Sequence, residues 1–157
     1  MTSKTTMYIA IAIVVIFVIV AGVLVYVYYK PGSPTPSGSN IDIYAGEVNL
    51  STPLYGFGNS ASSITSPVPE IDLTAGTTYT ITLHNSGTMP HNFAIVDSKS
   101  STANVLWSAQ VKSNSNPVNP GSTGSVTFTA GSAGNYYYIC QVDGHVALGM
   151  WGQVKVT

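Results

Sequence analysis

From residue 41 onward, hydrophobic and polar positions alternate in short runs separated by turn residues. The clearest run is Thr77–His84, where Tyr79, Ile81 and Leu83 share one face of an extended strand and threonines share the other. Several short runs of this kind are typical of a β-sandwich. The ranges expected to form strands are 41–44, 68–73, 77–84, 93–96, 105–111, 125–129, 135–140 and 152–156. The pattern predicts an all-β domain over residues 41–157.

Two stretches within this domain lack the alternation. Residues 50–69 and 112–124 are rich in Ser, Gly and Pro, which favour turns, so we expect surface loops there. Asn49-Leu-Ser51, at the start of the first stretch, matches the glycosylation acceptor motif, but an unused motif is the favoured interpretation.

The first 40 residues follow a different pattern. Met7–Tyr29 is an uncharged run rich in Ile and Val, and as a helix it would be roughly 35 Å long, enough to cross a bilayer. It predicts a single transmembrane α-helix after a short tail at 1–6. A cleaved signal peptide is the alternative, but the run is longer than usual and no small-x-small cleavage site follows it. Residues 30–40 contain mainly Pro, Gly and Ser and predict a semi-rigid linker.

Charged residues are unusually scarce. They make up 7% of the chain, with five Lys and Arg and six Asp and Glu, against about a quarter in typical soluble domains. The net charge of −1 leaves no basic patch, so the composition excludes nucleic acid as a partner.

Metal-binding chemistry is concentrated near the C-terminus. Directly after the expected strand 135–139, the only cysteine, Cys140, is followed by His145 and Met150 at equal spacings. An upstream histidine, His91, offers a second imidazole. One thiolate, two imidazoles and a weak thioether are the ligands of a blue copper electron-transfer site. The conjunction of these residue types, rather than any one of them, predicts a copper centre.

The loop that carries these residues also has the freedom to close around a metal. Gly144 and Gly149 supply backbone flexibility between the two sulfur-containing residues. The numbers of histidines and cysteines also exclude other classes of copper protein. The three histidines of this chain cannot build the further copper sites of a catalytic oxidase or reductase, and its single cysteine cannot bridge a binuclear centre.

The run Met89-Pro-His-Asn-Phe93, followed by Cys140-x4-His145-x4-Met150-Trp151, resembles the sulfocyanins, the membrane-anchored archaeal members of the cupredoxin family, and after them the rusticyanins. The resemblance implies a Greek-key β-sandwich holding one type 1 copper ion, with His91, Cys140, His145 and Met150 as ligands. It also implies a non-enzymatic carrier of single electrons between respiratory partners, such as a terminal oxidase or cytochrome complex.

The resemblance also suggests roles for residues near the ligands. Asn92 matches an asparagine that ties the two ligand loops together in many cupredoxins, and an ordinary turn asparagine is the alternative. His84 is the rival imidazole, but it lies on the polar face of an expected strand. The apolar residues expected to exclude water are Met89, Pro90, Phe93, Ala147, Leu148 and Trp151, with Ala147 and Leu148 forming a docking patch around the edge of His145.

Two questions stay open at this stage. The positive-inside comparison of Lys4 with Lys30 is almost a tie, so only the resemblance places the N-terminus in the cytoplasm and the copper domain outside the cell membrane. The alternative function is an extracytoplasmic copper carrier or chaperone, which would release copper readily to a competing chelator.

Overall fold

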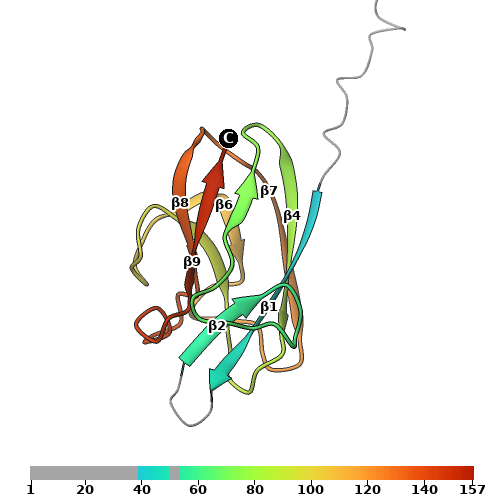
Figure 1. Cartoon of the computed structure of the whole chain (residues 1–157), viewed down its shortest axis with the longest axis vertical. Helices are drawn as coiled ribbons and strands as arrows, with labels where there is room; N and C mark the ends of the chain where they lie inside the picture. Colours follow the sequence, from blue (N-terminus) through green and yellow to red (C-terminus); the bar gives the residue numbers. More distant parts are fainter. Residues whose placement is uncertain (1–38, 50–53) are drawn as a thin grey trace, which may run out of the picture. The chain divides into compact units, whose positions relative to one another are not determined.

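The computed structural model describes residues 39–49 and 54–157, and these residues form nine β-strands (Figure 1). The all-β prediction is confirmed for this part of the chain. Within the same ranges, no helix is long and apolar enough to cross a membrane. The strands are β1 (Ser39–Asn49), β2 (Leu54–Gly58), β3 (Ile71–Leu73), β4 (Thr78–Asn85), β5 (Phe93–Val96), β6 (Val105–Val111), β7 (Thr123–Thr129), β8 (Gly134–Ile139) and β9 (Trp151–Val156).

The predicted tail, the predicted helix Met7–Tyr29 and most of the predicted linker lie outside the described residues. The linker boundary needs one correction, because β1 begins at Ser39 rather than at residue 41. Ser39 pairs with Tyr79 of β4 and Asn40 pairs with Thr80. Since this pairing uses backbone groups, polar residues can extend the strand beyond its apolar part.

The strands form two sheets, with the orders β2-β1-β4-β7 and β3-β9-β8-β5-β6. The chain changes sheet after β2, β3, β4, β6 and β7, so most connections pass between the layers. The pairs β1–β4 and β3–β9 are parallel, and the other pairs are antiparallel. This arrangement is a β-sandwich built from strands that are distant in sequence.

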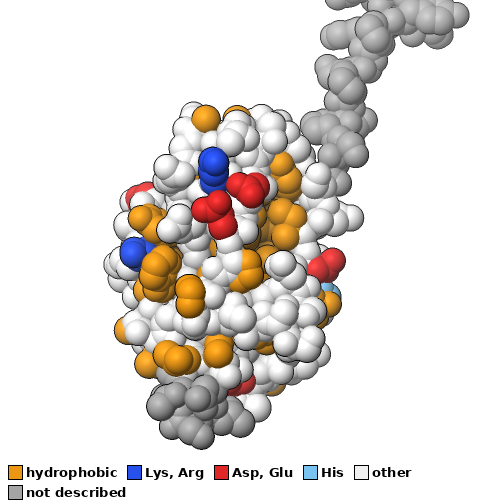
Figure 2. All heavy atoms as spheres, in the orientation of Figure 1, with side chains coloured by type: hydrophobic (Ala, Val, Ile, Leu, Met, Phe, Trp, Pro, Cys, Tyr) orange, Lys and Arg blue, Asp and Glu red, His pale blue; other side chains and the backbone are white. Residues whose placement is uncertain are grey.

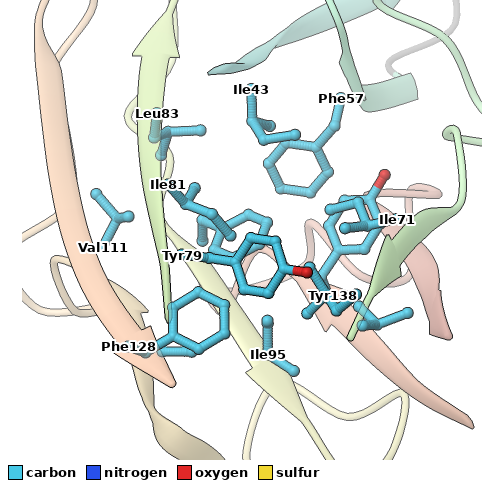
Figure 3. Packing of buried hydrophobic residues seen from close by; sticks show 14 of the residues in the cluster. Ile43, Phe57, Ile71, Tyr79, Ile81, Leu83, Ile95, Val111, Phe128 and Tyr138 are labelled. Carbon is cyan, nitrogen blue, oxygen red and sulfur yellow. The ribbon is translucent and has the colours of Figure 1, made fainter. Parts of the chain in front are cut away.

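The core lies between the two sheets (Figure 3). The alternation predicted for β4 is confirmed, because Tyr79, Ile81 and Leu83 are buried in it. Across the sandwich, Ile95 and Tyr138 fill the same cluster from β5 and β8. Each such side chain contributes roughly 1.5–3 kcal/mol by leaving water, so packing alone can hold the domain together.

Strand β2 corrects the prediction of a surface loop over residues 50–69. Its sequence, Leu-Tyr-Gly-Phe-Gly, has glycines where strand propensity is low, yet it pairs antiparallel with β1. The glycines are needed because a Cβ at Gly56 or Gly58 would collide with the backbone carbonyl of Thr65 or Ser63. Close approach of a neighbouring segment, rather than a turn, therefore explains both glycines.

Three other strands differ from the prediction by more than one residue at an end. Strand β1 continues to Asn49, past the expected end at residue 44, because Glu47 and Asn49 pair with β2. The expected strand 68–73 shortens to Ile71–Leu73, since Pro69 has no N–H to donate to a ladder. Strand β7 starts at Thr123, inside the predicted loop 112–124, because Thr123 and Gly124 pair with the end of β4.

Candidate metal centre

Three of the four predicted ligands converge on one point. The Cys140 Sγ lies 3.4 Å from His145 Nδ1 and 3.9 Å from His91 Nδ1, and the two Nδ1 atoms are 3.2 Å apart. A point equidistant from three atoms with these separations lies about 2 Å from each, which is the length of a metal–imidazole bond. The side chains are buried, with at most 4% of any of them exposed. The donor set therefore fits a single metal ion.

Antiparallel pairing brings these ligands together. His91 lies just before β5 and Cys140 just after β8, and because β5 and β8 run in opposite directions, the start of one lies beside the end of the other. His91 is further fixed by a two-way backbone bridge with Val118, with N···O distances of 3.1 and 2.7 Å. The upstream imidazole thus sits on rigid backbone.

The loop from Cys140 to Met150 is closed by its own backbone. The Cys140 N–H donates to the Met150 carbonyl at 3.1 Å, and the Met150 N–H donates to the His145 carbonyl at 3.0 Å. Gly144 and Gly149 have φ values of 81° and 92°, in the left-handed region that glycine adopts without strain. The Met150 side chain is fully buried in the same core cluster as Cys140. Its sulfur as the fourth, weak ligand stays a prediction.

Asn92 ties the two ligand loops together. Its side-chain carbonyl accepts a hydrogen bond from the Gln141 N–H at 2.6 Å, and its own N–H points at the Cys140 Sγ at 3.4 Å. The network continues through Gln141 Oε1, which accepts from Asn92 Nδ2 at 3.2 Å and from Gln110 Nε2 at 2.6 Å. The glutamines were not predicted from sequence, although Gln141 directly follows the cysteine. Such contacts orient metal ligands and tune the metal.

Glu47, at the end of β1, binds the loop that carries His91. Its carboxylate accepts hydrogen bonds from the Thr88 and Met89 N–H groups at 3.0 Å each and from the Thr88 hydroxyl at 3.1 Å. Burial alone would raise the pKa of the Glu47 carboxyl, but these donors outweigh burial and hold the pKa below its ordinary value. The carboxylate is therefore charged at neutral pH.

Tyr55, in β2, lies against both ligand histidines. Its ring centroid is 4.3 Å from that of His145, with the planes 31° apart, and 5.6 Å from that of His91, edge to face. The Tyr55 N–H also donates to the Leu148 carbonyl at 3.1 Å. The sequence analysis missed this residue because it placed the segment in a surface loop.

The surroundings set the protonation of the ligands. Burial, and then the charge of a protonated His145, lower the pKa of His91 to about 4, and burial also lowers the pKa of His145. Burial raises the pKa of the Cys140 thiol to about 11, against the opposing effect of the Asn92 and Val142 N–H groups. At neutral pH both imidazoles can donate a lone pair to a metal, whereas the thiol must lose a proton.

His84 does not belong to this centre. It lies on the outer face of β4, where its Nε2 is 2.8 Å from Asp42 Oδ1 and its ring stacks on Tyr44 at 4.6 Å. The buried residues of β4 point to the opposite face. The structure thus agrees with the ranking of His91 above His84.

The expected apolar surroundings need correction at three positions, Met89, Ala147 and Trp151. Met89 is 43% exposed, so it does not seal the site from water. Trp151 packs in a second cluster with Ile139 and Tyr137 rather than in the main core, because it follows the inward-pointing Met150 by one residue. Ala147 is exposed, so it does not exclude water either. Of the other expected residues, Phe93 is fully buried, and Pro90 and Leu148 are half-buried. His145 itself is only 4% exposed.

Residues 58–157 match the family model described as copper binding proteins, plastocyanin/azurin family. The chain belongs to this family. Its buried His-Cys-His cluster, with Met150 closing the loop, is the donor set of one type 1 copper ion. The cupredoxin fold and the copper cofactor expected from the sequence are thereby confirmed. No curated protein matches the chain by sequence.

Solved structures with the same fold include rusticyanin from Thiobacillus ferrooxidans, at 26% identity and a TM-score of 0.52, covering 77% of this chain and 79% of that one. Auracyanin B has 22% identity and a TM-score of 0.56, with 80% and 92% covered. A multicopper oxidase from Pseudomonas thermotolerans has 19% identity and a TM-score of 0.57, with 76% and 29% covered. This cupredoxin spans only 29–39% of the oxidases that it matches.

Proposed function

We propose that this cupredoxin is a sulfocyanin-like carrier of single electrons. The observation that carries the proposal is the buried cluster of His91, Cys140 and His145, held by loops that are tied to each other. Bound copper supplies a one-electron couple between Cu(II) and Cu(I). The protein's part is to keep the ligand positions fixed in both states, so that little rearrangement accompanies each transfer.

The ties described above support that role. The hydrogen bond from Gln141 to Asn92 joins the Cys140 loop to the His91 loop, and the Cys140–Met150 backbone bond closes the longer loop. Burial keeps water away from the donors and disfavours the more highly charged Cu(II) state. These features favour a rigid site with a raised reduction potential.

The membrane anchor, the location and the partners are part of the proposal. The apolar run Met7–Tyr29 and the Pro/Gly/Ser-rich residues 30–40 favour a copper domain tethered to the outer face of the cell membrane. There it would exchange electrons with respiratory proteins such as a terminal oxidase or a cytochrome complex. Fractionation tests the anchor: the full chain should require detergent for extraction, while a chain starting at Ser39 should not.

A copper carrier or chaperone is the alternative function, and exchange lability separates the two. A carrier should surrender copper to a competing chelator within the mixing time. A transfer site closed by Tyr55 and the Cys140–Met150 loop should retain its copper and undergo reversible redox cycles. Rapid loss of copper from the wild-type chain would favour the carrier.

The principal test is spectroscopic. The copper-loaded full chain in detergent should show an intense thiolate-to-Cu(II) absorption band and a small copper hyperfine splitting. Cys140→Ser should abolish the band because it removes the thiolate. His84→Ala is the matched control, since that histidine lies on the outer face of β4 and its loss should leave the spectrum unchanged. A wild-type protein without the band would refute the proposed function.

A further inference from the structure

Glu47 and Tyr55 are direct partners across the β1–β2 ladder. Residues opposite each other in an antiparallel pair project from the same face of the sheet. The inward positions of β1 before Glu47 are Ile43 and Ala45, which are buried. The pair therefore continues the inner face of the sheet to the place where the ligand loops meet.

Each member of the pair holds a different ligand loop. Glu47 binds the His91 loop through the N–H groups of Thr88 and Met89. Tyr55 binds the Cys140–Met150 loop through the Leu148 carbonyl and lies against the His145 ring. Neither Glu47 nor Tyr55 is one of the predicted metal ligands, so each holds a ligand loop in place without binding copper.

The two residues differ in what they bring to the site. Tyr55 covers His145, which is only 4% exposed although both neighbours in the chain are more open. Glu47 brings a negative charge. Its carboxylate is held by the N–H groups of Met89 and Thr88, two and three residues before His91 in the chain, so the charge lies beside the loop that carries the first imidazole.

We propose that Glu47 and Tyr55 are positioning residues of the copper centre, which fix the spacing of the His91 and His145 loops and set the reduction potential in opposite directions. The tyrosine ring excludes water and favours Cu(I), while the carboxylate favours Cu(II) by attraction. The inference requires only the copper site. Its consequence for electron transfer rests on the proposed function.

Opposite shifts of potential distinguish this role from simple loosening of the fold. Tyr55→Ala admits water to His145, so the ratio of Cu(II) to Cu(I) at a fixed applied potential should rise about tenfold, a shift of about −59 mV for one electron. Glu47→Gln removes the charge, so the same ratio should fall severalfold. Tyr55→Phe keeps the ring and should restore the wild-type value. If the substitutions only loosened the fold, water would enter the site in both Tyr55→Ala and Glu47→Gln, and both reduction potentials would fall.

The outer face of the same sheet offers matched controls. Tyr44 stacks on His84 at 4.6 Å, and Asp42 accepts from the same histidine, so Tyr44→Ala and Asp42→Asn remove the same kinds of group away from copper. Neither should change the potential of the copper-loaded full chain. Equal shifts in Tyr44→Ala and Tyr55→Ala, or shifts of the same sign in Tyr55→Ala and Glu47→Gln, would overturn the inference.

Hydrogen exchange of the metal-free chain gives a readout that needs neither copper nor electron transfer. Glu47→Gln should speed hydrogen exchange at the Thr88 and Met89 backbone amides by about tenfold or more. The glutamine side chain has one acceptor oxygen in place of two, and its NH₂ group cannot accept a hydrogen bond. Exchange at β8, such as Tyr138, should not change. Unchanged exchange at Thr88 and Met89 would overturn the positioning role, whether or not the wild-type chain proves to be an electron carrier.

Discussion

At the scale of single residues, the buried thiol of Cys140 governs the behaviour of the metal-free protein. Burial raises its pKa to about 11, so the sulfur carries a proton under all ordinary conditions. The adjacent imidazoles have lowered pKa values and are uncharged at neutral pH. Metal binding must therefore exchange one proton for one ion, because only the thiolate ligates copper.

This exchange predicts the pH dependence of copper affinity. Between neutral pH and about pH 10, Cu(II) binding should release one proton, and the affinity should fall tenfold for each unit of decreasing pH. In more acid solution the dependence should become steeper, because His145 and, near pH 4, His91 must then lose a proton too. Calorimetry in buffers of different ionisation enthalpy measures the protons released at pH 7. A value near zero would mean that the thiolate is already formed in the metal-free protein.

His91 also makes the metal-free protein sensitive to acid. Its pKa is about 4 in the folded state against about 6.5 when unfolded, so the unfolded chain binds a proton first. The stability that depends on neutral His91 is fully present above pH 6.5 and falls by about 3 kcal/mol as the pH drops to 4. Urea unfolding of metal-free protein at several pH values measures this loss. His91→Gln should remove much of the pH dependence.

The cluster of His91, Cys140 and His145 could be predicted from sequence, because cysteine and histidine have distinctive metal-binding chemistry and a characteristic spacing. The choice of His91 over His84 followed from strand alternation, which places His84 on the outer face. Glu47 and Tyr55 could not be found in this way. Their roles come from the β1–β2 register, and register is not visible in a strand whose sequence resembles a loop.

At the scale of elements, the strands with clear alternation or continuous apolar runs were predicted closely. The bounds of β5 and β6 agree with the predicted ranges, and those of β4 differ by one residue at each end. Strand β2 was missed because local propensity was outweighed by tertiary contact. A Cβ at either glycine would collide with the backbone of the segment Ser63–Thr65, which passes close to β2. The local sequence does not indicate this contact.

A substitution in β2 tests that explanation. Gly58→Ala would push a Cβ against the Ser63 carbonyl, so the strand or the crossing segment must shift. We expect a loss of about 1–3 kcal/mol in the free energy of unfolding, as for other overpacked sites. Ser62→Ala, at an exposed position of the same segment, should stay within about 0.5 kcal/mol of the wild type. Equal stability of Gly58→Ala and the wild type in urea would contradict the crowding argument.

At the scale of the whole described domain, one core cluster extends from the Tyr79 and Phe128 rings to Cys140 and Met150, but its two ends lie far apart along the strands. The copper ligands lie where β8 ends and β9 begins. Tyr79 and Phe128 stack on each other at the start of β4, whereas His91 follows the opposite end of that strand. Figure 2 shows that few charged side chains lie on the face drawn, so packing rather than ion pairing holds this surface together. The core can therefore be weakened without moving the ligands.

Phe128→Ala should demonstrate this separation. The ring is 4% exposed and stacks on Tyr79 and Trp107, so its loss should cost about 3–5 kcal/mol of unfolding free energy. The absorption band and reduction potential of the copper-loaded protein should stay at wild-type values. Chemical unfolding and spectroelectrochemistry on the same sample check both expectations. A displaced band would show that the far core does control the ligands.

The position of β9 between β3 and β8 has a consequence for how the protein is made. On the ribosome, β3 and β8 emerge before the strand that joins them, so the second layer cannot be completed until residues 151–156 have been synthesised. The backbone bond that closes the Cys140–Met150 loop forms equally late. Copper should thus be acquired only after translation of the domain is finished, and nascent chains arrested before residue 151 should remain sensitive to protease.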